Sequence, residues 1–157
     1  MAIFSNEVAD KVLRVMQSSN FVDPQKLSEA HSSSNGIPSA LLETLIRSGG
    51  TDEELVHKVL SRAYALRRCQ LEPKQVDVRA LALIPVSFID KHYAIPFQVE
   101  NRFLRVGIID PTTATLAGQL KSISNFNIEF QLISLSNFEA LRSHERIKSV
   151  LDSAQKK

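Results

Sequence analysis

Tryptophan is absent from this chain of 157 residues, and cysteine occurs only once, at Cys69. A single thiol excludes an internal disulfide and a zinc site made of several cysteines. No histidine or acid can be assigned beside Cys69, so a buried structural thiol is favoured over a nucleophile. The four histidines lie in four different expected elements and lack metal-ligand spacing: His31, His57, His92 and His144. We therefore expect no metal site and no catalytic cysteine.

A large charge of one sign is also missing. Because 19 basic residues stand against 17 acidic ones, the net charge of +2 gives no electrostatic argument for nucleic acid. The pairs Arg67-Arg68 and Lys156-Lys157 indicate solvated surface and tail. The longest apolar run, residues 80–86, is far shorter than the roughly 20 residues that cross a membrane, and the N-terminus lacks signal-peptide features. We expect a cytoplasmic protein without nucleic-acid binding or direct membrane insertion.

The sequence motifs of nucleotide-dependent and hydrolytic enzymes are not found. There is no G-x-x-x-x-G-K-S/T loop to hold phosphates, and no G-x-G-x-x-G, H-E-x-x-H or G-x-S-x-G pattern. Asp110 follows an expected strand, but no second titratable group is placed beside it, so a helix cap is favoured over an acid. Residues 144–146 indicate a solvated charged face. We predict no catalytic residue, no cofactor and no enzyme activity.

Apolar residues make up 43% of the chain, enough to bury a core, and the first half indicates helices. Asn6 is expected to cap a first helix that ends at residues 18–20 and carries an apolar stripe of Val8, Val12, Val15 and Met16. Asp23-Pro24 supplies a capping carboxylate and an initial proline for a second helix, which should end in the polar loop 31–36.

Two further helices are expected before residue 68. Ile37-Pro38-Ser39 opens the third, and Gly49-Gly50 ends it because glycine tolerates the left-handed conformation. Thr51, with Glu54 three residues later, predicts a capping box for the fourth. Its expected buried face contains Leu55, Val56, Val59, Leu60, Ala63 and Tyr64.

Beyond Arg68 the pattern indicates strands and short helices. A strand is expected at 69–71, helices at 78–83 and 86–93, and a hairpin of 94–99 and 102–109 that turns at Glu100-Asn101. The second hairpin strand is nearly all apolar and should be central and covered on both faces. The remaining expected elements are a helix after Asp110-Pro111, a strand at 127–134 with one wet face, and a final helix capped by Ser136 with Glu139.

Together these elements predict an α+β fold. A helical lobe of about four helices, residues 1–67, precedes a compact α/β lobe, residues 68–157. The second lobe should contain a small mixed or antiparallel sheet flanked by helices.

Three segments of the second lobe form a recognisable series: ALALIP at 80–85, FIDKHYAIPF at 88–97 and LRVGIIDP at 104–111. In order and spacing they resemble the N-terminal domain of type II secretion and type IV pilus assembly ATPases. That family shows leucine-isoleucine-proline, a helix ending in tyrosine, isoleucine-proline-leucine, and a strand ending in aspartate-proline. The resemblance covers residues 77–134.

The helical lobe resembles the same family more faintly. Residues 12–27 and 41–55 both run from a helix through a small polar or glycine stop to a capped helix, where some members carry two copies of a cyclic di-GMP motif. The motif's arginine and first glycine are replaced by Lys11 and Leu13 in the first copy, and by Ala40 and Leu42 in the second. Lysine lacks arginine's planar fork, alanine lacks charge, and leucine blocks the approach of the backbone to a ligand.

The resemblance implies a non-catalytic adaptor that docks on a protein partner of a secretion, pilus or motility system. Such a module would work in the cytoplasm and be recruited to an inner-membrane complex. The alternative is a cyclic di-GMP-binding regulatory module, for which the resemblance assigns Lys11, Arg14, Asn20, Arg47 and Gly49. An unrecognised enzyme has no support in the residues. The family's ATPase domain is absent, which leaves open both a fragment and a free-standing protein.

Overall fold

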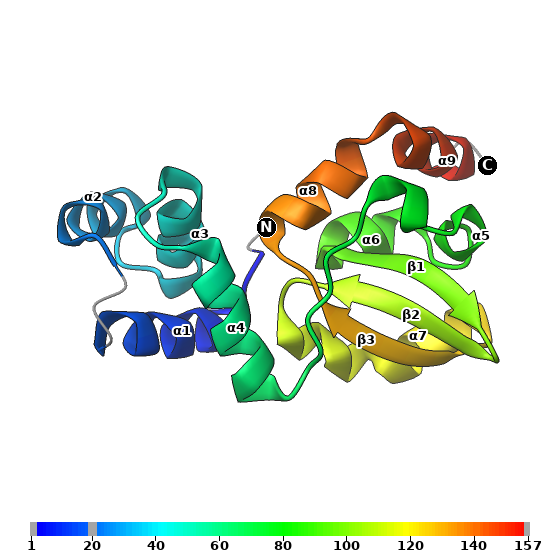
Figure 1. Ribbon diagram of the computed structural model, residues 1–157, viewed down its shortest axis with the longest axis horizontal. Helices are drawn as coiled ribbons and strands as arrows, with labels where there is room; N and C mark the ends of the chain where they lie inside the picture. The colour runs from blue at the N-terminus through cyan, green and yellow to red at the C-terminus, as the bar shows by residue number, and fades with distance from the viewer. Residues whose placement is uncertain (1–2, 19–21, 156–157) are drawn as a thin grey trace. The chain divides into compact units, whose positions relative to one another are not determined.

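The computed structural model describes residues 3–18 and 22–155 of the protein. The chain forms two compact units, Met1–Ala65 and Leu66–Lys157. The first unit is helical, and the second combines helices with a three-stranded sheet (Figure 1). The predicted α+β fold is therefore confirmed. In the described part of the chain, no helix is long and apolar enough to span a membrane.

The first unit is built from helices whose apolar faces meet in one core. They are α1 (Asn6–Ser18), α2 (Pro24–Ser34), α3 (Pro38–Ser48) and α4 (Glu53–Tyr64). α1 packs against α3 and α4, while α2 packs against α3. Met16, Leu42 and Leu45 are fully buried between them. Val15 of the apolar stripe is exposed, and the burial predicted for Ala63 is wrong; both residues lie on the outer faces of their helices.

Side chains and glycine set the helix ends. Asp23 caps α2 as predicted, since its Oδ1 accepts hydrogen bonds from the N–H groups of Gln25 at 2.9 Å and Lys26 at 3.3 Å. Gly49 ends α3 in the left-handed conformation, with a φ of 76°. The helix α2 extends into the predicted polar loop as far as Ser34, because Asn35 is the residue that adopts the left-handed conformation, with a φ of 55°.

Two predicted caps in this unit are wrong. Asn6 is the first residue of α1, and its Oδ1 accepts a hydrogen bond from the N–H of Ser39 in the first turn of α3, at 3.1 Å. The hydroxyl of Ser5 accepts a hydrogen bond from the first turn of α1 instead. At α4 the cap is Asp52 rather than Thr51, because the Oδ1 of Asp52 accepts a hydrogen bond from the N–H two residues later, at 2.9 Å.

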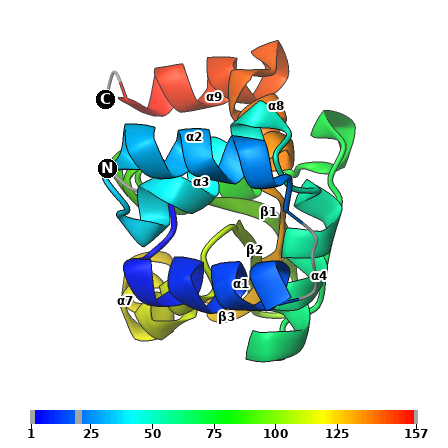
Figure 2. The same cartoon turned by 90° about the vertical axis from the view of Figure 1, so that its left-hand side faces the viewer.

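The second unit contains a mixed sheet of β1 (Ala94–Glu100), β2 (Phe103–Ile108) and β3 (Asn127–Leu132). β2 is central as predicted, antiparallel to β1 and parallel to β3. In Figures 1 and 2, α7 lies on one side of the sheet, and α8 and α9 lie on the other. The other elements of the unit are η1 (Pro73–Gln75), α5 (Val78–Leu81), α6 (Val86–His92), η2 (Pro111–Leu116), α7 (Ala117–Ser124), α8 (Leu135–Ser143) and α9 (Glu145–Gln155).

The hairpin turns one residue later than predicted. Glu100 pairs with Phe103, and the turn residues Asn101 and Arg102 have φ values of 48° and 70°. Two consecutive left-handed residues give a two-residue turn the twist that an antiparallel pair needs. The prediction that β2 is covered on both faces is wrong at this end, where Phe103 is 43% exposed and Arg105 is half-buried.

The ends of the second unit also differ from the prediction. Residues 69–71 form no strand, because only Arg68 bridges to Leu132 at the end of β3. The final helix is divided into α8 and α9 at His144, which is extended, with a ψ of 134°. Its predicted cap is wrong too, since the hydroxyl of Ser134, and not that of Ser136, accepts the capping hydrogen bond at 3.1 Å.

Candidate functional site

Two loops of the helical unit lie side by side, one before α2 and one before α4. Val22 and Thr51 form an antiparallel bridge, and the N–H of Asp23 donates to the carbonyl of Gly50 at 2.8 Å. We call Val22, Asp23, Gly49, Gly50 and Thr51 the paired-loop site. The two copies of the predicted internal repeat meet here, so a ligand that bridged the copies would contact this place.

The close packing around Gly50 holds the two loops together. A Cβ atom at this position would lie 2.8 Å from Leu45 Cδ2 and 3.0 Å from Lys26 Cβ. The Nζ of Lys26 donates to the carbonyl of Ser48 at 2.7 Å, which satisfies one of the carbonyls that a helix leaves free at its C-terminus. Lys26 was not among the residues assigned from sequence, because its partner lies 22 residues away and no local pattern indicates the contact.

The charged residues assigned to cyclic di-GMP have separate partners in the structure. The Nζ of Lys11 lies 5.1 Å from the centre of the Tyr64 ring. Arg14 and Arg47 form ion pairs with the acids four residues earlier, at 3.0 and 3.2 Å. Exposed pairs of this kind contribute only about 0.2–1 kcal/mol, so either guanidinium could exchange its carboxylate for a phosphate at little cost.

The positions of the motif's first glycine are filled by core side chains. Leu13 is 5% exposed, and Leu42 is fully buried. Their side chains occupy the core, so the backbone at these positions cannot meet a ligand in the way that glycine allows. Gly49 forms part of the paired-loop site, and Asn20 lies outside the described residues.

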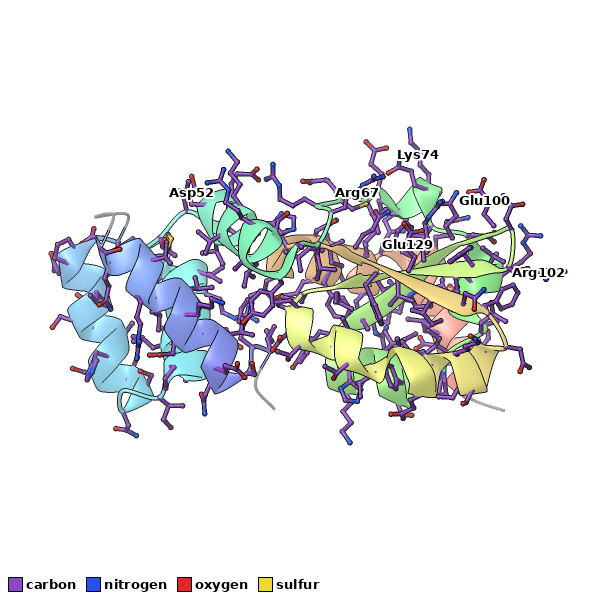
Figure 3. All side chains as sticks on the ribbon, turned by 90° about the horizontal axis from the view of Figure 1, so that it is seen from below. Asp52, Arg67, Lys74, Glu100, Arg102 and Glu129 are labelled. Atoms are coloured by element: carbon purple, nitrogen blue, oxygen red, sulfur yellow. The ribbon has the colours of Figure 1, made fainter. Side chains whose placement is uncertain are left out.

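In the second unit, Arg105 connects the three strands at the hairpin end of the sheet. Its guanidinium donates to Gln98 Oε1 at 2.6 Å, Glu100 Oε2 at 2.9 Å and Glu129 Oε2 at 2.8 Å. Figure 3 labels both glutamates, which come from β1 and β3. The hydrogen bond to Glu129, followed by that to Glu100, raises the pKa of Arg105 above its usual value. We call these four residues the polar sheet cluster, which is partly exposed.

Other titratable groups of this unit have structural explanations. The Oδ1 of Asp110 accepts hydrogen bonds from the N–H and the hydroxyl of Thr112, at 2.8 and 2.7 Å, which confirms the predicted cap. Burial raises the pKa of the Cys69 thiol, which disfavours the reactive thiolate. Burial, followed by the charge of Lys91, lowers the pKa of His92. Among residues 3–18 and 22–155, no three histidines, cysteines or acids form a group that could hold a metal ion.

Two structural residues were missed from sequence because their partners are distant backbone atoms. Arg146 is exposed, as predicted for residues 144–146, but it also donates to the carbonyls of Pro73 and Val76, at 2.7 Å each. The buried amide of Asn137 donates to the carbonyl of Leu71 and accepts from its N–H, both at 2.9 Å. Both residues fix the segment that precedes α5 rather than forming a site.

Comparison with known proteins gives one family and several relatives. The MshEN domain family matches residues 52–145. The type IV pilus assembly ATPase PilB of Myxococcus xanthus is 24% identical over 110 residues, which cover 70% of this chain and 19% of that protein. The chain therefore spans about a fifth of the length of this curated relative.

Solved structures with the same fold cover nearly all of the chain. A structure of MshE with cdg (cyclic di-GMP) has a TM-score of 0.54 and 18% identity, over 95% of this chain and 96% of that one. The N-terminal domain of XpsE has a TM-score of 0.54 and 15% identity, over 87% and 93%. The resemblance noted in residues 77–134 is thus confirmed by a match that includes both hairpin strands. The chain belongs to the MshEN domain family, the N-terminal domain of type II secretion and type IV pilus assembly ATPases.

Proposed function

We propose that this chain is a non-catalytic docking module of a type II secretion, type IV pilus or motility system. The observation that carries the proposal is the burial of Leu13 and Leu42, which stand where the cyclic di-GMP motif that this lobe resembles has its first glycine. Such a chain keeps the apolar scaffold of the domain and loses the close backbone approach that a dinucleotide needs. A protein partner is the ligand class that this scaffold still suits.

The surface of the second unit supports a docking role. Phe103 is 43% exposed and pairs with Glu100, a member of the polar sheet cluster. Exposed aromatic side chains beside polar groups are typical of the surfaces that proteins use to bind one another. The chain would act in the cytoplasm and be recruited to an inner-membrane complex through its partner.

Affinity capture from the membrane and cytoplasmic fractions of the native organism tests the docking role. The folded chain should recover a component of a secretion, pilus or motility complex. Leu104→Asp places a carboxylate at a fully buried position of β2 and serves as an unfolded control. Capture of no such component, or equal capture by the control, would contradict the proposal.

A second candidate is a cyclic di-GMP-binding regulatory module. It is favoured by the paired-loop site, in which the two repeat copies meet, and by the likeness to MshE with cdg over 95% of the chain. Titration calorimetry with the dinucleotide separates the two candidates. The docking proposal expects no heat of binding. Binding at micromolar concentrations or tighter, weakened by Arg14→Ala or Arg47→Ala, would support the regulatory module instead.

The proposal also expects no enzyme activity. No phosphate-holding loop is present in the sequence, and the backbone and lysine that such a loop provides are what position ATP for hydrolysis. Incubation of the purified chain with ATP and magnesium should release no phosphate above the rate without protein. A rate that scales with the amount of chain and survives repeated purification would overturn this part of the proposal.

A further inference from the structure

The outer edge of β3 has a regular pattern of backbone groups. In the parallel pairing with β2, the N–H of Asn127 donates to Arg102 and the N–H of Ile133 donates to Ile108, both at 2.9 Å. Backbone groups of a strand alternate in direction, so the N–H and C=O of the even-numbered residues point away from β2. The N–H of Leu132 confirms this, because it donates outward to the carbonyl of Arg67 at 2.8 Å.

Only the last part of this edge is occupied by the described chain itself. Leu132 is bridged by Arg68, and the N–H of Cys69 donates to the carbonyl of Leu132 at 2.8 Å. The outward N–H and C=O groups of Ile128 and Phe130 have no such partner among the described residues. The chain therefore begins a fourth row of the sheet at Leu132 and leaves the same row open beside Ile128 and Phe130.

The side chains beside the open row have two different characters. Ile128 and Phe130 are half-buried and lie on one face of β3. Glu129 lies on the other face, with 42% of its side chain exposed, and it belongs to the polar sheet cluster. A strand that filled the row would need apolar residues on the first face and a group complementary to a carboxylate on the second.

The charge of Glu129 decides which occupant fits. Arg105 is bound to Glu129 at 2.8 Å, but the polar sheet cluster also contains Glu100 and therefore has a net negative charge. In an antiparallel pairing of two copies centred on Glu129, two such clusters would face each other, and like charges opposite each other are destabilising. The segment with which the chain itself fills the row carries Arg67 and Arg68, and strand alternation places Arg67 on the face of Glu129. A basic extended segment matches the row better than a second copy does.

We infer that the open edge of β3 binds an extended segment of a protein partner, which adds a strand beside Ile128 and Phe130. The segment carries alternating apolar residues, with lysine or arginine opposite Glu129. Backbone hydrogen bonds supply affinity in this mode of recognition, and the alternating side chains supply specificity. The inference rests on the proposed docking role and specifies where and how the partner is held.

Selection of binding peptides from a random displayed library, with the purified full chain as bait, tests the inference. Enriched peptides should alternate apolar and basic residues and should protect the amides of Ile128 and Phe130 from hydrogen exchange. Ile128→Pro removes an outward N–H and leaves the hydrogen bonds to β2 in place. It should lower the affinity of these peptides about tenfold, which is the upper range for the loss of one hydrogen bond. Ile128→Ala is the matched control that trims the side chain and keeps the N–H.

A second variant keeps the test decisive if Ile128→Pro does not fold. Glu129→Gln removes the charge and keeps the shape, so it should abolish the preference for basic peptides over versions with neutral residues. Several results would overturn the inference: no enrichment, enriched peptides that are not extended or basic, binding unaffected by both variants, or a dimer of the chain that Ile128→Pro dissociates.

The test of the β3 edge and the test of the docking role can fail independently of each other. A captured native component that still binds Ile128→Pro with unchanged affinity would refute the edge while the docking role stood. Peptides that bind the edge as described, with no native component captured, would leave the edge intact and refute the docking role.

Discussion

The close contact at Gly50 leads to a prediction whose sign can be worked out from the structure. In Gly50→Ala the new methyl carbon lies 2.8 Å from Leu45 Cδ2 and 3.0 Å from Lys26 Cβ. Both distances are well inside the roughly 3.5–4.0 Å at which two carbon atoms attract each other most strongly. Leu45 is fully buried, so its methyl group has no free space into which it can retreat.

Two effects of this substitution oppose each other. Overpacking of a filled core typically costs about 1–3 kcal/mol. Replacement of glycine by alanine also restricts the unfolded chain, which returns about 0.4–1 kcal/mol. Because the 2.8 Å contact involves a fully buried side chain, the steric cost should lie in the upper part of its range, about 2–3 kcal/mol, and the free energy of unfolding should fall by about 1–2.6 kcal/mol.

Urea denaturation followed by far-UV circular dichroism measures this change. Gly118→Ala is the matched control, since a Cβ atom added at this position in α7 would meet nothing within 4 Å. That variant should gain about 0.5–1 kcal/mol, the usual difference between alanine and glycine in a helix. A Gly50→Ala chain as stable as the original, or a shift of the same sign in both variants, would refute the packing argument.

Three further predictions concern the second unit. Asn137→Ala should lower the free energy of unfolding by about 2–3 kcal/mol, measured in urea, because both backbone groups of Leu71 lose their partners. Asn137→Asp should also destabilise the chain, since a carboxylate cannot donate a hydrogen bond to the carbonyl of Leu71. Arg146→Ala should cost about 1–2 kcal/mol in the same assay through the loss of two hydrogen bonds of 2.7 Å, and a neutral result would contradict their role. The lowered pKa of His92 means that the unfolded chain binds its proton more readily. The stability that depends on a neutral His92 should be fully present at a pH above 6.5, the ordinary pKa of histidine. It should be lost as the pH falls through the lower pKa of the folded chain. His92→Gln should flatten that part of the stability profile, and an unchanged slope would rule out this residue as its source.

The fold could be predicted from sequence wherever a local pattern determines the backbone. Apolar spacing predicted the helices of the first unit, and the run from Phe103 to Ile109 predicted the central strand. Helix starts were harder, because neighbouring polar residues compete for one cap. Ser5 and Asp52 accept the hydrogen bonds from the free N–H groups that Asn6 and Thr51 were expected to bind. Which of two neighbouring residues becomes the cap depends on the residue at which the first helical turn begins.

The candidate site was less accessible to sequence reasoning because it depends on contacts between distant segments. The repeat predicted two similar loops, but no local pattern indicates that Val22 pairs with Thr51. The polar sheet cluster was missed for a related reason. Arg105 lies within a strand of apolar residues, and its partners become visible only when the register of three strands is known.

The bridge between Arg68 and Leu132 has a consequence for how the α/β unit can be isolated. The N–H of Leu132 needs the carbonyl of Arg67, and the amide of Asn137 needs both backbone groups of Leu71. An expression boundary placed just before the first strand would therefore leave the N–H of Leu132 and the buried amide of Asn137 without their partners. A stable shortened version should start no later than Leu66, well before the sheet itself begins at Ala94.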